Sequence, residues 1–415
     1  MHPRTWTLRS LSGSALQWLW VCAAVALLAG SASALFLFSL DWATRTREAH
    51  PGLIWGLPLV GFAVGWLYLK WGQSVDAGNN LLIDEIHDPR RVVPLRMAPL
   101  ILGSTVASHL VGASVGREGT AVQMGGALAD QLSHRFQFSA AQRQVVLMTG
   151  MAAGFASVFG TPLAGAVFAL EVLAGPALRQ MRWAALLPCA LAALGADQVG
   201  LWWGVQHTAY AVGGVPAFTA WGVCALLLAG GLMGLTGRVF ALSTHGLSAW
   251  IKQRIAYAPL RPLIGGALIA VVVSVLPAER YLGLGIPVIV EAFSQPLAPW
   301  DFAAKLALTV ASLGSGFKGG EVTPLFYIGA ALGNALAPLL QMPIGLMAAV
   351  GFVAVFAGAA KTPLACTVMA MELFGVEVGA FAAVACAVSY GFSGRASIYK
   401  AQRQRPAKLL QPPRR

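Results

Sequence analysis

Charged residues are scarce in this sequence, and their scarcity excludes most soluble proteins. Only 11% of the 415 residues are Asp, Glu, Lys or Arg, whereas soluble domains carry about 25%. Hydrophobic residues make up 57% of the chain, and the mean hydropathy is +0.69. Long apolar stretches separated by short basic loops are typical of helical proteins that cross a membrane many times. We therefore expect an all-α polytopic membrane protein embedded in a lipid bilayer.

Paired cysteines and metal-binding motifs are also missing. The five cysteines occur singly in apolar segments: Cys22, Cys189, Cys224, Cys366 and Cys386. None has the spacing of a disulfide framework or a metal site, so we interpret them as small core residues. The His-Glu-x-x-His motif of zinc proteases does not occur. The sequence therefore predicts neither a metal nor another cofactor.

The few charges are unevenly distributed. The formal net charge is +12, and basic residues gather at both ends of the chain. Arg4 and Arg9 precede the first apolar run, which continues to Leu40 and is too long for a signal peptide. The basic residues after the last run are Arg395, Lys400, Arg403, Arg405, Lys408, Arg414 and Arg415. The positive-inside rule then predicts a multi-pass inner-membrane protein with both termini in the cytoplasm. We do not expect the basic tail to bind nucleic acid.

Several apolar segments are too short to cross a bilayer. Crossing about 30 Å of hydrocarbon needs about 20 helical residues. The segments at 119–132, 262–276 and 363–374 are shorter and are bounded by glycine or proline. Such segments are typical of half-helices that meet near the membrane midplane of transporters. Irregular backbone between them survives only where protein buries it or where it lines an aqueous cavity.

An internal repeat divides the chain. Thr161-Pro162-Leu163-Ala164 and Glu171 recur about 200 residues later as Thr362-Pro363-Leu364-Ala365 and Glu372. A second block, with Glu118 and Thr120, recurs as Glu321 and Thr323. The predicted parts are a first transmembrane repeat at 1–203, a linker at 204–216, a second, inverted repeat at 217–400 and a basic cytoplasmic tail at 401–415. Duplicated halves with broken helices place the substrate site of a transporter where the halves meet.

The stretch Gly116-Arg117-Glu118-Gly119-Thr120 carries the most informative chemistry. A carboxylate at membrane depth marks an ion or proton path by default. The glycines let the backbone approach a ligand closely, and a helix that begins at Glu118 offers free N–H groups to a small anion. A carboxylate at such a site can compete with the anion and exchange a proton when it leaves. The structural alternative is a helix N-terminal glutamate paired with Arg117.

Two further glycine-containing stretches are expected to reach the same place. The first is 78–85, where the amide of Asn79 can donate to an anion and Asn80 can cap the following helix. The second is 314–324, where Pro324 suits a first helical turn. A plain helix cap in a polar loop is the alternative for the first stretch.

These stretches resemble the motifs of the CLC family of chloride channels and anion/proton antiporters, and the resemblance covers nearly the whole chain. Gly116–Gly119 matches the gating-glutamate motif. The first family motif falls on Gly78–Leu82, where Asn79 replaces the anion-coordinating serine, and the third falls on Gly320–Pro324. Phe392–Tyr399 aligns with the segment whose tyrosine hydroxyl faces the central anion.

The resemblance implies a CLC-like fold of two inverted-topology repeats with broken helices, assembled as a homodimer. It makes Glu118 the gating and proton-coupling residue. The implied anion-binding residues are Asn79, Gly116, Arg117, Gly119, Thr120, Glu321, Val322, Thr323 and Tyr399.

Departures from the chloride-transporting members resemble the fluoride-exporting branch. These are the lost serine, the Gly-Arg-Glu-Gly-Thr form and the presence of Glu321. Val172 also stands where chloride/proton antiporters place their inner proton glutamate. The resemblance therefore implies a fluoride/proton antiporter that exports cytoplasmic fluoride. The alternatives are a chloride/proton antiporter or chloride channel and, more remotely, a membrane-embedded hydrolase using Glu118 with His109.

Fluoride chemistry agrees with this interpretation. Fluoride is small and strongly hydrated, so removing its water requires several good hydrogen-bond donors in compensation. Asn79, Thr120, Thr323 and Tyr399 are expected to supply them. Some members of the branch contact fluoride with phenylalanine ring edges, but residues 72–135 contain no Phe, and Phe317 and Phe326 are the nearest candidates.

Other buried polar residues receive structural interpretations. Glu321 would repel an anion if ionised, so we expect it to cap backbone amides or to be protonated. His109 is expected to be a packing residue. Glu171 and Glu372, at matched helix ends, are expected to satisfy backbone or interface groups.

Overall fold

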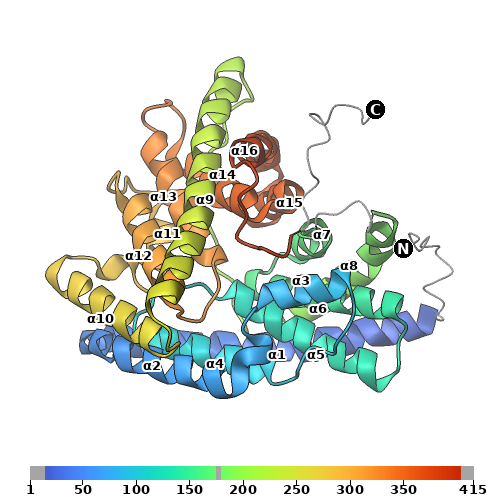
Figure 1. Ribbon diagram of the computed structural model, residues 1–415. Coiled ribbons are helices and arrows are strands. Elements are labelled where there is room, and N and C mark those ends of the chain that lie inside the picture. The colour runs from blue at the N-terminus through green and yellow to red at the C-terminus, as the bar shows by residue number, and fades with distance from the viewer. Residues whose placement is uncertain (1–14, 174–178, 403–415) are drawn as a thin grey trace, which may run out of the picture.

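The computed structural model describes residues 15–173 and 179–402, which form helices joined by short connections (Figure 1). The first eight α-helices are α1 (Ala15–Ala49), α2 (Leu57–Leu67), α3 (Asn79–His87), α4 (Met97–Leu110), α5 (Glu118–Arg135), α6 (Ala140–Phe159), α7 (Pro162–Glu171) and α8 (Arg179–Trp202). The next eight are α9 (Ala220–Arg254), α10 (Leu260–Val275), α11 (Ile286–Glu291), α12 (Asp301–Ser315), α13 (Val322–Leu336), α14 (Ile344–Ala360), α15 (Pro363–Phe374) and α16 (Gly379–Phe392). Short 3₁₀ or π segments are η2 (Pro51–Gly56), η3 (Tyr68–Gly72), η4 (Gln73–Val75), η6 (Glu279–Tyr281) and η7 (Val376–Val378). The basic terminal residues Arg4, Arg9 and 403–415 lie outside the described residues.

The helices after α8 repeat the order of those before α9, with inverted topology. Helices α1 and α9 are both 35 residues long, and each begins its half. Within each half the sixth helix packs closely on the fifth: α6 on α5 and α14 on α13. Figure 1 shows the first half, in blue and green, below and to the right of the second half, in yellow to red. The prediction of an all-α fold of inverted repeats is confirmed.

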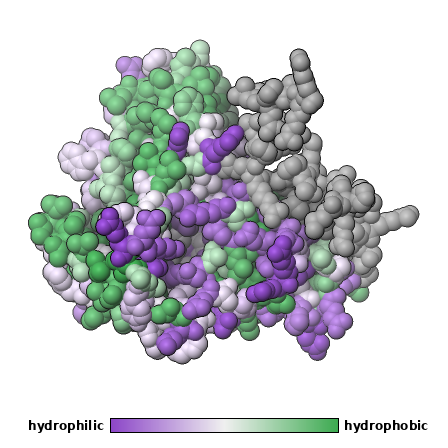
Figure 2. Space-filling view, viewed as in Figure 1, coloured by the Kyte–Doolittle hydropathy of each residue, from purple (hydrophilic) through white to green (hydrophobic). Residues whose placement is uncertain are grey.

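Helix length and surface composition fit a membrane. Among the described residues, four helical stretches are long and apolar enough to cross one: Ala15–Ala49, Pro51–His87, Ala184–Trp202 and Ala220–Arg254. Helices α7, α13 and α15 have only 10 to 15 residues and are too short to cross alone. Figure 2 shows hydrophobic residues over α10 and around the top of α9, whereas hydrophilic residues run across the middle of this face.

Small residues bring the central helices into backbone contact. A Cβ atom on Gly125 of α5 would lie 2.2 Å from the carbonyl oxygen of Gly150 on α6. A Cβ atom on Gly329 of α13 would lie 2.1 Å from the carbonyl oxygen of Gly351 on α14. Only glycine fits at such crossings, so the two halves use the same device to bring their helices together.

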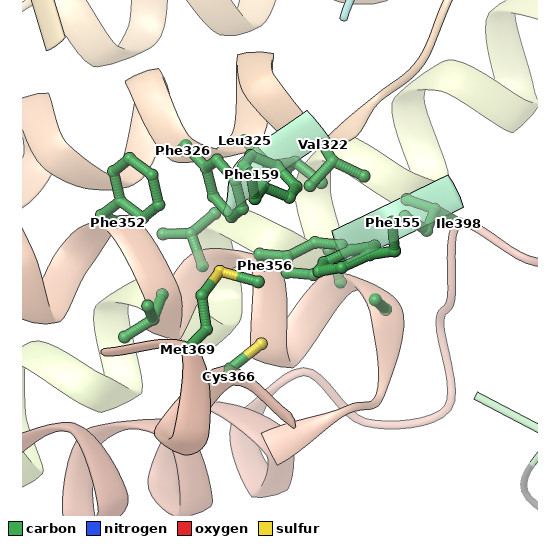
Figure 3. Close-up of a cluster of buried hydrophobic side chains, with 14 of the residues drawn as sticks. Phe155, Phe159, Val322, Leu325, Phe326, Phe352, Phe356, Cys366, Met369 and Ile398 are labelled. Carbon is green, nitrogen blue, oxygen red and sulfur yellow. The ribbon is translucent and has the colours of Figure 1, made fainter. Parts of the chain in front are cut away.

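An aromatic cluster fills the interior between the halves (Figure 3). Phe155 and Phe159 come from α6, whereas Phe326, Phe352 and Phe356 come from α13 and α14. The rings of Phe326 and Phe352 stack with centroids 3.9 Å apart and planes 15° apart. Because the cluster combines rings from both halves, its burial stabilises their association.

The repeated Thr-Pro-Leu-Ala blocks begin α7 and α15, which lie side by side and antiparallel. At the end of α15, Glu372 accepts hydrogen bonds from the backbone N–H groups of Leu163 and Ala164, at 2.9 and 2.8 Å. At the end of α7, Glu171 accepts from two N–H groups at the start of α15, at 3.0 and 2.8 Å. Each carboxylate therefore caps the helix of the other half, as expected for residues that satisfy backbone groups.

Candidate functional site

Two backbone segments from opposite halves cross at the centre of the molecule. Gly116 and Gly320 form an antiparallel bridge in which each N–H donates to the other residue's carbonyl, at 2.5 and 2.7 Å. A Cβ atom on Gly320 would lie 2.8 Å from the backbone nitrogen of Gly119, so the approach requires glycine. Helices α5 and α13 begin two residues beyond this bridge. The bridge therefore holds their N-termini close to each other.

Glu118, the first residue of α5, lies on the N-terminus of α13. Its side chain is fully buried, at 0% exposure. Its two carboxylate oxygens accept hydrogen bonds from the backbone N–H of Thr323 at 2.9 Å and from the Thr323 hydroxyl at 2.5 Å. The backbone N–H of Arg117 also donates to it at 3.2 Å, and the Arg117 guanidinium lies 3.4 Å away. A helix N-terminus with a hydroxyl donor can bind an anionic group, and here that group is the Glu118 carboxylate.

Of the two expectations for Glu321, a cap of backbone amides or a protonated group, the structure does not show the cap. Glu321 directly precedes α13, but its side chain makes no capping hydrogen bond. The acceptor for Thr323 comes instead from Glu118 in the other half, because the Gly116–Gly320 bridge places that carboxylate over the first turn. The Glu321 side chain is partly exposed and turns toward Gly119, from whose Cβ position its Oε2 atom lies 3.6 Å away.

Asn79 lies on the same side of Gly119. Its Nδ2 atom is 3.1 Å from a Cβ atom placed on that glycine, so the amide and the Glu321 carboxylate flank one short piece of backbone. The side chain of Asn79 is buried, and its Oδ1 atom has no hydrogen-bond partner among the described residues. The structure thus brings Asn79 together with Gly119 and Glu321.

The prediction that Asn80 caps α3 is wrong. Helix α3 begins after Gly78 without a side-chain cap, and the Asn80 Oδ1 atom accepts from the backbone N–H of Ala401 at 2.9 Å. This contact ties the first helix of the site to the chain that follows Tyr399. Asn80 does not cap its own helix because its side-chain oxygen accepts from the backbone of Ala401, 321 residues along the chain.

Tyr399 is held against the site by its own backbone. The N–H of Tyr399 donates to the Ser397 hydroxyl at 3.1 Å, and that of Ile398 donates to the Ala359 carbonyl at 3.0 Å. The tyrosine is buried, and its ring meets that of Phe168 edge to face at 6.4 Å. These contacts fix Tyr399 against α7 and the end of α14, and its contact with an anion stays a prediction.

The remaining predicted residues take different positions. The Thr120 hydroxyl pairs with that of Thr105 on α4 at 2.8 Å, so the contact it makes fixes α5 against α4. Val322 is buried as the first residue of α13. Arg117 faces a cavity of about 850 Å³ that Arg47 and Arg280 also line. Glu118 is not among the residues that line this cavity, but its carboxylate lies 3.4 Å from the Arg117 guanidinium.

The two phenylalanines named as candidates for a ring-edge contact are both buried in the hydrophobic core. Phe317 packs toward Gly61 on α2, and Phe326 stacks in the aromatic cluster of Figure 3. The ring that meets Tyr399 belongs to Phe168 of α7, which no sequence motif singles out. No local pattern could have identified it, because Phe168 reaches Tyr399 through tertiary packing across more than 200 residues.

The hydrolase alternative finds no support in the geometry. Gly112-Ala113-Ser114-Val115-Gly116 has the spacing of a hydrolase nucleophile motif, but the Ser114 hydroxyl bonds to the Tyr281 carbonyl and to Thr309, at 3.0 and 2.9 Å. His109 directs Nδ1 to the Thr105 carbonyl at 2.8 Å. A serine nucleophile needs a base within hydrogen-bond reach, and Ser114 shows no bond to a histidine.

Comparison with known proteins identifies the family. The sequence model described as voltage gated chloride channel matches residues 60–394. The chain belongs to the CLC family. This CLC chain is 62% identical over 393 residues to a protein of Pseudomonas syringae pv. tomato named "Chloride/fluoride channel protein", covering 93% of this chain and 86% of that one.

Solved CLC structures have the same fold. A crystal structure of a CLC-type fluoride/proton antiporter matches with a TM-score of 0.90 and 35% identity, covering 94% of this chain and 98% of the other. A slow cyanobacterial Cl⁻/H⁺ antiporter matches with a TM-score of 0.79 at 19% identity, covering 95% and 97%. The second match concerns the fold alone.

Proposed function

We propose that this CLC protein is a fluoride/proton antiporter that exports cytoplasmic fluoride at the expense of the proton gradient. One observation carries the proposal: the Glu118 carboxylate occupies the N-terminus of α13, bound by the N–H and hydroxyl of Thr323. A side chain that fills an anion site can leave it only if something neutralises or displaces it. The printed names of the Pseudomonas relative and of the structure at 35% identity support fluoride as the anion.

Coupling follows from the use of one side chain by both ions. Ionised Glu118 accepts both Thr323 donors and excludes an anion from them. Protonation removes the charge that makes these hydrogen bonds strong, so the side chain can swing away and an anion can take its place. When the anion leaves, Glu118 returns and must release its proton. Proton and anion therefore move in opposite directions through one site.

The donors around the site suit fluoride. The proposed anion-binding residues are Asn79, Gly116, Arg117, Gly119, Thr120, Glu321, Val322, Thr323 and Tyr399. Asn79 contributes an amide near Gly119, where chloride-transporting members present a serine. Val172, which follows Glu171 at the end of α7, is fully buried and cannot carry a proton. The inner proton route must therefore differ from that of chloride/proton antiporters, which remain the second candidate function.

Purified protein in liposomes tests the proposal directly. With a proton gradient imposed across the membrane, a fluoride electrode should record fluoride movement against its own gradient, accompanied by protons in the opposite direction. Empty liposomes set the background leak of hydrofluoric acid. Fluoride movement without proton movement would show that the protein is a channel and not an antiporter. Turnover of a lipid or peptide substrate without ion flux would show that the protein is a hydrolase and not a transporter.

We also propose the arrangement of the chain in the membrane. Residues 1–203 and 217–400 would be the two inverted repeats, 204–216 the external linker and 401–415 a cytoplasmic tail in a bacterial-type inner membrane. Family membership supports a homodimer with one pathway in each subunit.

Cysteine labelling tests this topology. Because the basic residues at both ends favour the cytoplasm, single cysteines at positions 2 and 412 of a cysteine-free protein should react only from that side. A cysteine at position 217, in the exposed connection before α9, should react only from outside. Labelling of either terminus from outside would refute the arrangement.

A further inference from the structure

A lysine–aspartate pair joins the two segments that carry the anion site. The Lys318 ammonium lies 2.5 Å from an Asp76 carboxylate oxygen and 4.1 Å from the centre of the Tyr68 ring. Asp76 precedes Asn79 by three residues, and Lys318 precedes Glu321 by three residues. The pair therefore connects the two halves next to the residues that flank Gly119.

The Lys318–Asp76 pair is accessible to solvent, whereas Glu118 is not. The side chain of Lys318 is 20% exposed and that of Asp76 is 53% exposed, whereas Glu118 is fully buried. Three residues of chain span at most about 11 Å, so Lys318 stands within that distance of Glu321 along the backbone. Lys318 therefore lies near Glu321 and is accessible from solvent.

The charges around the pair favour anions. Lys252, at the end of α9, and Arg261, at the start of α10, both act on Asp76. With Lys318 they make three positive charges against one carboxylate. A surface region that carries mainly one sign of charge raises the local concentration of the opposite ion.

We propose that Lys318 is an anion-capture residue on the solvent-exposed side of the Asn79 and Glu321 segments, and that Asp76 holds its ammonium until an anion arrives. The lysine ammonium bears three N–H donors. Fluoride is a strong hydrogen-bond acceptor, so the ammonium can bind it directly through a charge-assisted hydrogen bond. Asp76 and the incoming anion compete for the same ammonium. The inference rests on the proposed anion transport. It adds a first anion-binding site, from which the anion passes to the central site.

The two partners of the pair give the proposal a decisive test. If Lys318 captures the anion, Lys318→Met should raise the half-saturating fluoride concentration about tenfold, with little change in the maximal rate, because one charge-assisted hydrogen bond is lost. Asp76→Asn removes the competitor and should lower the half-saturating concentration about threefold, roughly the effect of losing one exposed ion pair. If the pair only fastens the two segments together, both variants break the same contact and should impair transport alike.

Initial rates of fluoride movement into and out of proteoliposomes measure these constants, with the fraction of protein in each orientation scored by labelling of a cysteine at position 217. Lys318→Arg should retain the wild-type constant, and Lys70→Met removes an exposed lysine near the same end of α2 as a matched control. Lys318→Gln replaces the methionine variant if that protein does not fold. Shifts of both partners in the same direction, or no shift in Lys318→Met, overturn the inference.

The same proteins separate failure of this inference from failure of the proposed function. If the wild-type protein moves chloride and not fluoride, the constants are measured with chloride, and opposite shifts still support capture. If the wild-type protein moves fluoride but the half-saturating concentrations of the two variants shift in the same direction, the transport proposal stands and the capture role of Lys318 is wrong.

Discussion

Glu118→Gln should abolish proton-coupled fluoride exchange while leaving a folded protein. The amide has nearly the shape of the carboxylate, and its oxygen can still accept from the Thr323 N–H that Glu118 now engages at 2.9 Å. It cannot take up and release a proton near neutral pH, so the step that links opening of the site to proton movement is lost. Proton pumping driven by a fluoride gradient should fall to the level of empty liposomes, a loss of at least about 100-fold for a group that transfers the proton.

A second carboxylate provides the control. Glu372→Gln makes the same chemical change at the cap of α7, where the carboxylate contacts backbone rather than a transport donor. We expect it to lower thermal stability, since a helix cap contributes about 1 kcal/mol, without abolishing coupling. Proton pumping at the wild-type rate in Glu118→Gln would show that another group carries the proton.

Fluoride flux should exceed chloride flux by at least about tenfold in the wild-type protein, a ratio that needs only about 1.4 kcal/mol of differential stabilisation. The physical reason is the donor set. Asn79 brings an amide on a longer arm than serine to the side of Gly119. Thr323 and Tyr399 add hydroxyls, which chloride, as a larger and weaker acceptor, uses less fully.

Asn79→Ser should erode this ratio chiefly by admitting chloride. Both halides are measured in the same preparation of proteoliposomes under the same proton gradient, so that protein density and orientation cancel. Asn80→Ser is a matched control, because the neighbouring amide contacts the Ala401 backbone instead of the site. Equal wild-type fluxes of the two halides would refute fluoride selectivity. An unchanged ratio in Asn79→Ser would transfer selectivity to Thr323, Tyr399 or the backbone.

The fold was predictable from the sequence because its signals are repeated. Short apolar segments, glycines at close crossings and the doubled Thr-Pro-Leu-Ala block each point to two halves with broken helices. The family motifs also selected Asn79, whose amide lies beside Gly119, and Tyr399, whose contact with an anion stays a prediction. The local sequence did not reveal the hydrogen-bond partners of the buried polar side chains.

Two corrections illustrate that limit. Glu321 is the N-cap residue of α13, and Asn80 is the second residue of α3, so both lie near a helix start where a polar side chain often caps. In the structure Glu118 replaces Glu321 as the acceptor for α13, and Asn80 binds the Ala401 backbone. Each outcome depends on a contact between residues more than 200 positions apart. Tertiary geometry thus overrides the local rule where two segments meet.

The exchanged caps of α7 and α15 have a consequence for biosynthesis. Glu372, which completes the N-terminus of α7, lies 209 residues after Leu163. A ribosome that adds 5–20 residues each second needs about 10–40 s to make that length of chain. During this interval the first turn of α7 must satisfy its amides with water or with the insertion machinery. The first half therefore reaches its final form only after the second half has been translated and inserted.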